Sequence, residues 1–163
     1  MKIIKFIMLM GLVLSLSACT ESKEHEVTFE EQIKKELDKN LNNGYDVIID
    51  YDLKDDYVFV FYRETGIGTL SVSVLKQNKE GLNLILSESL FAGTMVVGNG
   101  ETPYITVVQT EDSSIEQVEV KGVPARYVSY IDSPVEGVTL AKSYWVSYNY
   151  TEPTIEDIVI MNK

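Results

Sequence analysis

The stretch Tyr57-Val58-Phe59-Val60-Phe61-Tyr62 is apolar at every position and rich in aromatic and β-branched residues. Successive side chains of a β-strand point to opposite faces, so a strand of this composition must bury both of its faces. A strand buried on both faces belongs inside a sheet and not at its edge. We therefore predict a central strand at residues 57–62.

The segments on either side of this strand have alternating patterns that predict further strands. We expect these strands at residues 46–52, 69–74 and 82–87, separated by turns at 53–56, 63–68 and 77–81. One face of the 69–74 strand is small and polar. Strands joined in sequence by short turns predict a four-stranded antiparallel meander.

A helix is predicted before the meander. Thr28-Phe29-Glu30-Glu31 has the form of a capping box, in which Thr and Glu satisfy each other's backbone N–H groups. Apolar residues then follow at a spacing of four, which gives one narrow stripe; they are Phe29, Ile33, Leu37 and Leu41. We expect a helix at 29–42, ended by Gly44 in the left-handed C′ position, with its stripe packed on the sheet.

The second half of the chain has no helical periodicity. We expect a junction at 89–102 with a short strand at 93–97, and then strands at 104–108, 115–120, 125–130, 142–150 and 155–161. Lys121-Gly122 fits a two-residue turn joining the second and third of these five strands as a hairpin. This spacing is typical of a sandwich, and the half loosely resembles a short immunoglobulin-like module in fold alone.

The predicted fold class is therefore α+β: one helix on an antiparallel meander, followed by a small all-β, sandwich-like half. The boundaries are 28–88 for the helix and meander and 103–163 for the second half. Each half is close to the lower size limit for independent folding. We favour two small subdomains packed together, and one continuous structure is the alternative.

The N-terminus has the pattern of a secretory signal peptide. Two lysines in residues 1–5 precede an almost wholly apolar segment at 6–16. That segment is too short for a spanning helix, which needs about 20 apolar residues.

Leu16-Ser17-Ala18-Cys19 then resembles the lipobox of bacterial lipoproteins. The resemblance implies that residues 1–18 are removed and that a diacylglycerol is attached to the Cys19 sulfur, with acyl chains such as palmitate. It also implies a location on the extracytoplasmic face of the cell membrane, in the cell envelope. Two acyl chains suffice for a stable anchor. Residues 19–27 would form a lipidated tether, and its segment 20–27 can reach at most about 26–29 Å.

Composition excludes several classes of function. The formal net charge is −11, and it would become −13 once the signal peptide with Lys2 and Lys5 is removed. This charge argues against nucleic acid, and it would attract a cationic partner. Solubility outside the cell is the favoured interpretation of the charge. Cys19 is the only cysteine and His25 the only histidine, so Ser-His-Asp triads, Cys-His pairs and His-rich metal sites lack their parts. We expect no cofactor other than the covalent diacylglycerol.

Four carboxylates lie close together at the end of the first predicted strand: Asp50, Asp52, Asp55 and Asp56. Calcium takes six to eight oxygen ligands, and an acidic turn can supply several of them. The EF-hand pattern fails here, and a solvated acidic turn is the favoured interpretation. His25 with its neighbouring glutamates is a weaker metal candidate, and a solvated linker is favoured there.

A run of aromatic residues near the C-terminus is the candidate binding face: Tyr144, Trp145, Tyr148 and Tyr150. In a strand, Tyr144, Tyr148 and Tyr150 share one face, and Trp145 lies on the other beside Ser147 and Asn149. One face should be core. The other would expose Trp145 beside polar groups, as in carbohydrate- and peptide-binding strands. A core position for Trp145 is the favoured of the two interpretations.

These observations predict a non-catalytic, membrane-anchored surface lipoprotein that binds a protein or peptide through a strand edge or the aromatic face. A structural or accessory subunit of an envelope complex is the first alternative. A small hydrolase that uses carboxylates, or a Ser-Lys pair, is the second.

Overall fold

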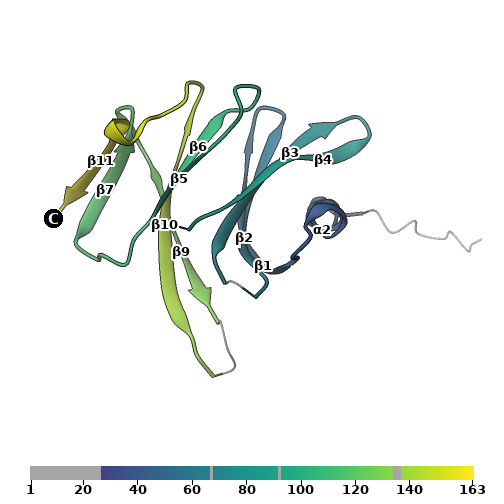
Figure 1. Ribbon diagram of the computed structural model, residues 1–163, viewed down its shortest axis with the longest axis horizontal. Coiled ribbons are helices and arrows are strands. Elements are labelled where there is room, and N and C mark those ends of the chain that lie inside the picture. The colour runs from purple at the N-terminus through teal and green to yellow at the C-terminus, as the bar shows by residue number, and fades with distance from the viewer. Residues whose placement is uncertain (1–26, 67, 92, 134–136) are drawn as a thin grey trace, which may run out of the picture.

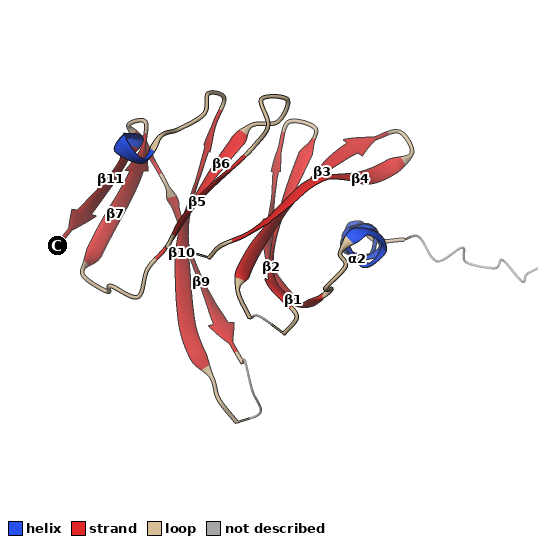
Figure 2. Ribbon diagram, in the orientation of Figure 1, coloured by secondary structure: helices blue, strands red, loops and turns tan. Residues whose placement is uncertain are grey.

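The computed structural model describes residues 27–66, 68–91, 93–133 and 137–163 (Figure 1). The predicted signal peptide, the lipobox with Cys19, and His25 lie outside the described residues, as does the tether except for Val27. Figure 2 shows that the described chain consists mainly of strands, with a single α-helix near its start.

The first sheet, which we call the meander sheet, is antiparallel and has four strands in the order β1-β2-β3-β4. Its strands are β1 (Tyr45–Lys54), β2 (Tyr57–Glu64), β3 (Leu70–Asn78) and β4 (Gly81–Ser89). This topology confirms the predicted meander and the interior position of the strand that begins at Tyr57. The strands are longer than expected, and the predicted turn at 53–56 shortens to Asp55-Asp56.

Helix α2 (Phe29–Asn40) begins with the predicted capping box. Thr28 Oγ1 accepts a hydrogen bond from the N–H of Glu31, and the Glu31 carboxylate accepts the N–H of Thr28 at 2.7 Å. The predicted end at residue 42 is wrong, because the cap residue Leu41 is extended. From that conformation Leu41 still packs against the buried cluster beneath the helix, so its apolar character does not require it to be helical.

The second half of the chain forms two further antiparallel sheets. The second sheet contains, in spatial order, β5 (Thr94–Val97), β6 (Tyr104–Gln109), β10 (Leu140–Asn149) and β9 (Arg126–Asp132). The third sheet contains β11 (Ile158–Asn162), β7 (Ile115–Val120) and β8 (Val123–Pro124). A short 3₁₀ helix, η1 (Ile155–Asp157), stands where the last strand was expected to begin.

The expected hairpin at Lys121-Gly122 forms, but the prediction that residues 125–130 form its second strand is wrong. Both turn residues have positive φ, 52° and 73°, as a type I′ turn requires. The returning strand is only the two-residue β8, and its Pro124 has no N–H to continue a ladder. The following residues instead form β9, which pairs with β10 in the second sheet.

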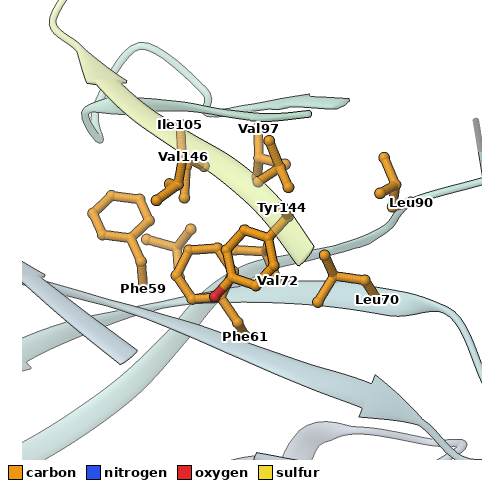
Figure 3. Close-up of a cluster of buried hydrophobic side chains, with 11 residues drawn as sticks. Phe59, Phe61, Leu70, Val72, Leu90, Val97, Ile105, Tyr144 and Val146 are labelled. Atoms are coloured by element: carbon orange, nitrogen blue, oxygen red, sulfur yellow. The ribbon is translucent and has the colours of Figure 1, made fainter. Parts of the chain in front are cut away.

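One apolar core lies between the meander sheet and the second sheet (Figure 3). Phe59 and Phe61 of β2 pack there with Tyr144 and Val146 of β10, and the Phe61 and Tyr144 rings stack with centroids 5.0 Å apart. The two halves of the chain therefore share a core, and the sheets that stack face to face come one from each half.

A second core lies on the opposite face of the meander sheet, beneath α2. Ile33 and Leu37 of the helix are fully buried against Val58, Val60 and neighbouring leucines. The layers thus run from α2 through the meander sheet and the second sheet to the third sheet, as Figure 1 shows. These findings establish the α+β class, with one helix on an antiparallel meander followed by an all-β half.

Candidate binding groove

The acidic residues of β1 hold the two sheets together at their edges. Arg126 of β9 places its guanidinium against Asp50 and Asp52, with Nη2 lying 3.0 Å from Asp50 Oδ2. The Tyr148 hydroxyl donates to Asp52 Oδ2 at 2.6 Å. Burial alone would lower the pKa of Arg126, but its hydrogen bonds to Asp52 and Asp50 outweigh burial and raise it. Arg126 therefore stays charged and joins the sheets.

The four aspartates of the weaker calcium candidate have different partners in the structure. Asp50 and Asp52 face a guanidinium, and Asp55 accepts a hydrogen bond from the Tyr150 hydroxyl at 3.2 Å. Asp56 takes part through its backbone carbonyl, which accepts the N–H of Gln77. Within the described ranges, no group of three or more His, Cys, Asp or Glu residues is placed to hold a metal ion.

The four aromatic residues of the predicted binding face do not share a surface. Tyr144 is fully buried in the core between the sheets, so it cannot touch a partner. Tyr148 is half-buried with its ring 5.0 Å from that of Phe59, and Tyr150 is 80% exposed beyond the end of the strand. Burial raises the pKa of both Tyr144 and Tyr148, and the Asp52 carboxylate adds to the rise for Tyr148.

Trp145, in contrast, lines a concave site. It is half-buried on the face of the second sheet opposite the Tyr144 core and belongs to neither apolar core, so its interpretation as a core residue is wrong. Its cross-strand neighbour is Tyr127 of β9, and the two rings lie 4.9 Å apart at 56°. Tyr127 is 53% exposed.

This aromatic pair forms part of the lining of a groove of about 920 Å³. The other lining residues include the start of β10, the segment 109–116, which runs from the end of β6 into β7, and Gly93 before β5. Lys163 at the C-terminus also reaches the groove. Five separate parts of the chain, counting the β9 residue Tyr127, therefore meet around Trp145.

Hydrogen bonds fix the segment that borders the groove. Gln109 donates its N–H to the Gly93 carbonyl at 2.6 Å, and Lys163 donates its N–H to the Ser114 carbonyl at 2.9 Å. The Asp112 carboxylate accepts the N–H of Ser114 at 2.8 Å. The groove is thus preformed, which reduces the entropy cost of binding.

Three acidic side chains and two lysines, Lys142 and Lys163, line the groove, and the Lys163 ammonium lies 3.5 Å from the Ser113 carbonyl. Glu111, Asp112 and Glu116 contribute carboxylates, and hydrogen bonds from Ser114 lower the pKa of Asp112. Lys142, the lysine on the β10 side, has its Nζ 2.7 Å from the buried Asp132. The ion pairs between described residues include neither Glu111 nor Glu116. These two carboxylates are free to meet a cationic ligand.

Comparison of the chain with protein-family models, with curated proteins and with solved structures found no match. No helix in the described part of the chain is both long enough and apolar enough to cross a membrane. The groove residues Tyr127, Glu111 and Glu116 were not predicted as site residues from the sequence.

Proposed function

We propose that this protein is a non-catalytic binding module that holds an extended segment of a partner protein in the groove. The observation that carries the proposal is the Trp145–Tyr127 pair, two large rings in contact that line the groove on one face of the second sheet. Such rings supply a large contact area at a low cost in conformational entropy. Aromatic anchors of this kind dominate the energetics of protein interfaces.

The position of β9 supports an extended ligand. β9 is the outermost strand of the second sheet, and within the described ranges it pairs with β10 alone. Its outer row of backbone N–H and C=O groups can therefore pair with an added strand, the mode by which many modules capture extended peptides. Ile131 of the same strand is 67% exposed and would contact alternate side chains of such a peptide.

The charge of the groove supports a cationic ligand. Glu111 and Glu116 are exposed at its border, and the whole chain carries a formal net charge of −11. Opposite charge on the partner segment would speed association and fix its orientation, and the effect would weaken with added salt. We infer that the segment carries lysine or arginine beside apolar side chains.

The lipobox resemblance completes the proposal. A diacylglycerol on Cys19 would hold the module at the extracytoplasmic face of the cell membrane, where its partner would be another envelope protein. Incorporation of an alkyne-labelled palmitate tests this part. Label in the wild-type chain and its loss in Cys19→Ala support the anchor, and equal labelling of both contradicts it.

Selection of a random nine-residue peptide display library on the full chain tests the groove. We expect enriched peptides to carry Lys or Arg beside apolar residues, and Trp145→Ala to weaken their binding at least roughly tenfold. The matched control is Tyr150→Ala, which removes an exposed aromatic ring outside the groove. Peptides that bind wild-type and Trp145→Ala proteins equally would contradict the proposal, as would a library that yields no binders.

A further inference from the structure

A second, smaller pocket lies at the other side of the molecule, on the helix-facing side of the meander sheet. It measures about 290 Å³ and lies where α2 ends and the chain turns into β1. Tyr62 and Glu64 of β2 and Ser87 and Ser89 of β4 contribute polar groups to it. It shares no lining residue with the groove, so what it binds is independent of the function proposed above.

The central group of this pocket is the Glu64 carboxylate, whose residue is only 9% exposed. Oε2 accepts hydrogen bonds from Ser89 Oγ at 2.6 Å and Ser71 Oγ at 3.3 Å, and Oε1 accepts one from Asn43 Nδ2 at 2.8 Å. The bonds from Ser89 and Asn43 outweigh the opposing effect of burial and lower the pKa of Glu64. The carboxylate is therefore ionised at neutral pH.

This buried charge has no cationic partner in the described part of the chain. None of the ion pairs there includes Glu64, and no Lys or Arg lines the pocket. The adjacent Arg63 points to the other face of the sheet, where it binds Asp46 and Asp132. Buried charges are usually paired, because an uncompensated one loses solvation free energy.

The other polar groups around Glu64 add acceptor sites. The Tyr62 hydroxyl and Ser87 Oγ lie 2.7 Å apart, and Ser73 Oγ donates to Ser87 at 3.1 Å. A hydroxyl oxygen has two acceptor lone pairs. Ser89 donates to Glu64 and accepts from Ser71 Oγ at 2.9 Å, so it keeps one lone pair for a ligand. A carboxylate and several hydroxyls thus offer acceptors in one small space.

We propose that this pocket binds a primary ammonium group carried on a short aliphatic stem. An ammonium has three N–H donors and no acceptor, which complements one carboxylate and the neighbouring hydroxyl oxygens. Leu41 and Leu84 also line the pocket and would contact the stem. The lowered pKa of Glu64 makes it a poor general base for Ser89, so the arrangement favours binding over acyl transfer. A free alkylamine and a lysine side chain share the required chemistry.

Calorimetric titration of the full chain with n-butylamine tests the proposal. The two comparison ligands are n-butanol, which has no charge, and tetramethylammonium, which has charge but no N–H donor. We expect n-butylamine to bind in the millimolar range or tighter and both comparison ligands to bind at least roughly tenfold more weakly. Binding of Nα-acetyl-lysine methylamide more tightly than n-butylamine would identify a lysine side chain as the ligand, and the reverse order a free amine.

Two substitutions distinguish binding in the pocket from general attraction of the amine by the negative charge of the chain. Glu64→Gln removes the buried charge, and Glu88→Gln removes an exposed charge from β4 between the two serines of the pocket. We expect the first to lower n-butylamine affinity at least roughly tenfold and the second to leave it unchanged. Ser87→Ala, which keeps Glu64 intact, should lower the n-butylamine affinity severalfold. This variant tests the proposal if Glu64→Gln does not fold. No n-butylamine binding, equal binding of tetramethylammonium, or equal effects of the two glutamine variants would each overturn the proposal.

Discussion

The two faces of the meander sheet differ in how completely they are covered. The face toward the second sheet is closed by an apolar layer, in which Phe61 and Tyr144 stack, with ion pairs at its edges. The face toward α2 is apolar only along part of its length, where Ile33 and Leu37 cover Val58 and Val60. Beyond the last turn of the helix it becomes polar.

This difference teaches what each surface contributes. Apolar burial between the sheets supplies stability and couples the two halves of the chain. The polar end of the other face carries buried Ser71, Ser73 and Glu64, which add little net stability because each polar group exchanges water for a protein partner. Such a region makes sense as a binding site more readily than as a core.

Phe61→Ala should have the largest effect, because Phe61 is fully buried in the core that the two halves share. We expect a loss of about 3–5 kcal/mol in the free energy of unfolding, measured by denaturant titration. Trp145 fluorescence and far-ultraviolet circular dichroism should shift together to lower denaturant. A Trp145 transition that stays at its wild-type midpoint would contradict a shared core.

Asp132→Asn should come next. Asp132 is only 3% exposed and lies between Arg63 and Lys142 at the edge of the same layer. Arg63 keeps Asp46 as a partner and Lys142 is partly exposed, so we expect a loss of about 2 kcal/mol, less than for a fully buried pair. Lys34→Gln, which breaks an exposed pair with Glu30, is the control and should change stability little. Equal effects of the two variants would contradict the role of Asp132.

Ser73→Ala should have a smaller effect than Val60→Ala, although the two residues are cross-strand neighbours on the helix-facing side. Removing the Ser73 hydroxyl leaves Tyr62 and Ser87 bonded to each other, so we expect a loss of about 1 kcal/mol or less. Val60→Ala leaves a cavity and should cost about 1–3 kcal/mol. Denaturant titration of both variants measures the difference, and a reversed order would contradict the contrast between the two ends of this face.

Acid should weaken both faces of the meander sheet. Burial alone would raise the pKa of Asp132, but its hydrogen bonds with Lys142 and Arg63 outweigh burial and lower it, and the pKa of Glu64 is also lowered. The unfolded chain binds protons at the ordinary values of 3.8 and 4.5 and the folded chain only at lower pH. Their contribution to stability is therefore present above these values and is lost as pH falls through and below them. Glu64→Gln should reduce this pH dependence, and an unchanged slope of stability against pH would contradict the assignment.

Local patterns were enough to predict the helix and the meander. The capping box at Thr28 and the both-sided apolar strand at Tyr57 are signals contained within a few residues. Because turns of only a few residues join these strands, antiparallel pairing of sequence neighbours is the simplest arrangement.

Long-range pairing could not be predicted in the same way. Strand alternation placed Tyr144 and Trp145 on opposite faces, but it did not show which of them faces the core. The contact between Trp145 and Tyr127 depends on the register of β9 against β10, which no local pattern states. The partner of Asp50 and Asp52 is Arg126, which lies in another sheet. The acidic residues alone therefore favoured a solvated turn, with a metal site as the weaker candidate.

The Glu64 pocket combines a local pattern that the sequence shows with a strand pairing that it does not. The small polar face of the 69–74 strand was visible in the sequence, and Ser87 and Ser89 repeat the same spacing on the next strand. Only the register of β2, β3 and β4 places these serines beside Glu64 and Tyr62.

The most direct test of the groove uses the fluorescence of Trp145, the only tryptophan in the chain. The full chain is titrated with a cationic peptide from the display selection, and separately with the same peptide after its Lys and Arg residues are changed to Glu. We predict a saturable change in Trp145 emission with the cationic peptide, weakened by salt and absent with the acidic one. Cationic peptide binding that is detected by calorimetry but leaves Trp145 emission unchanged would show that the peptide binds elsewhere, and would contradict the proposed function.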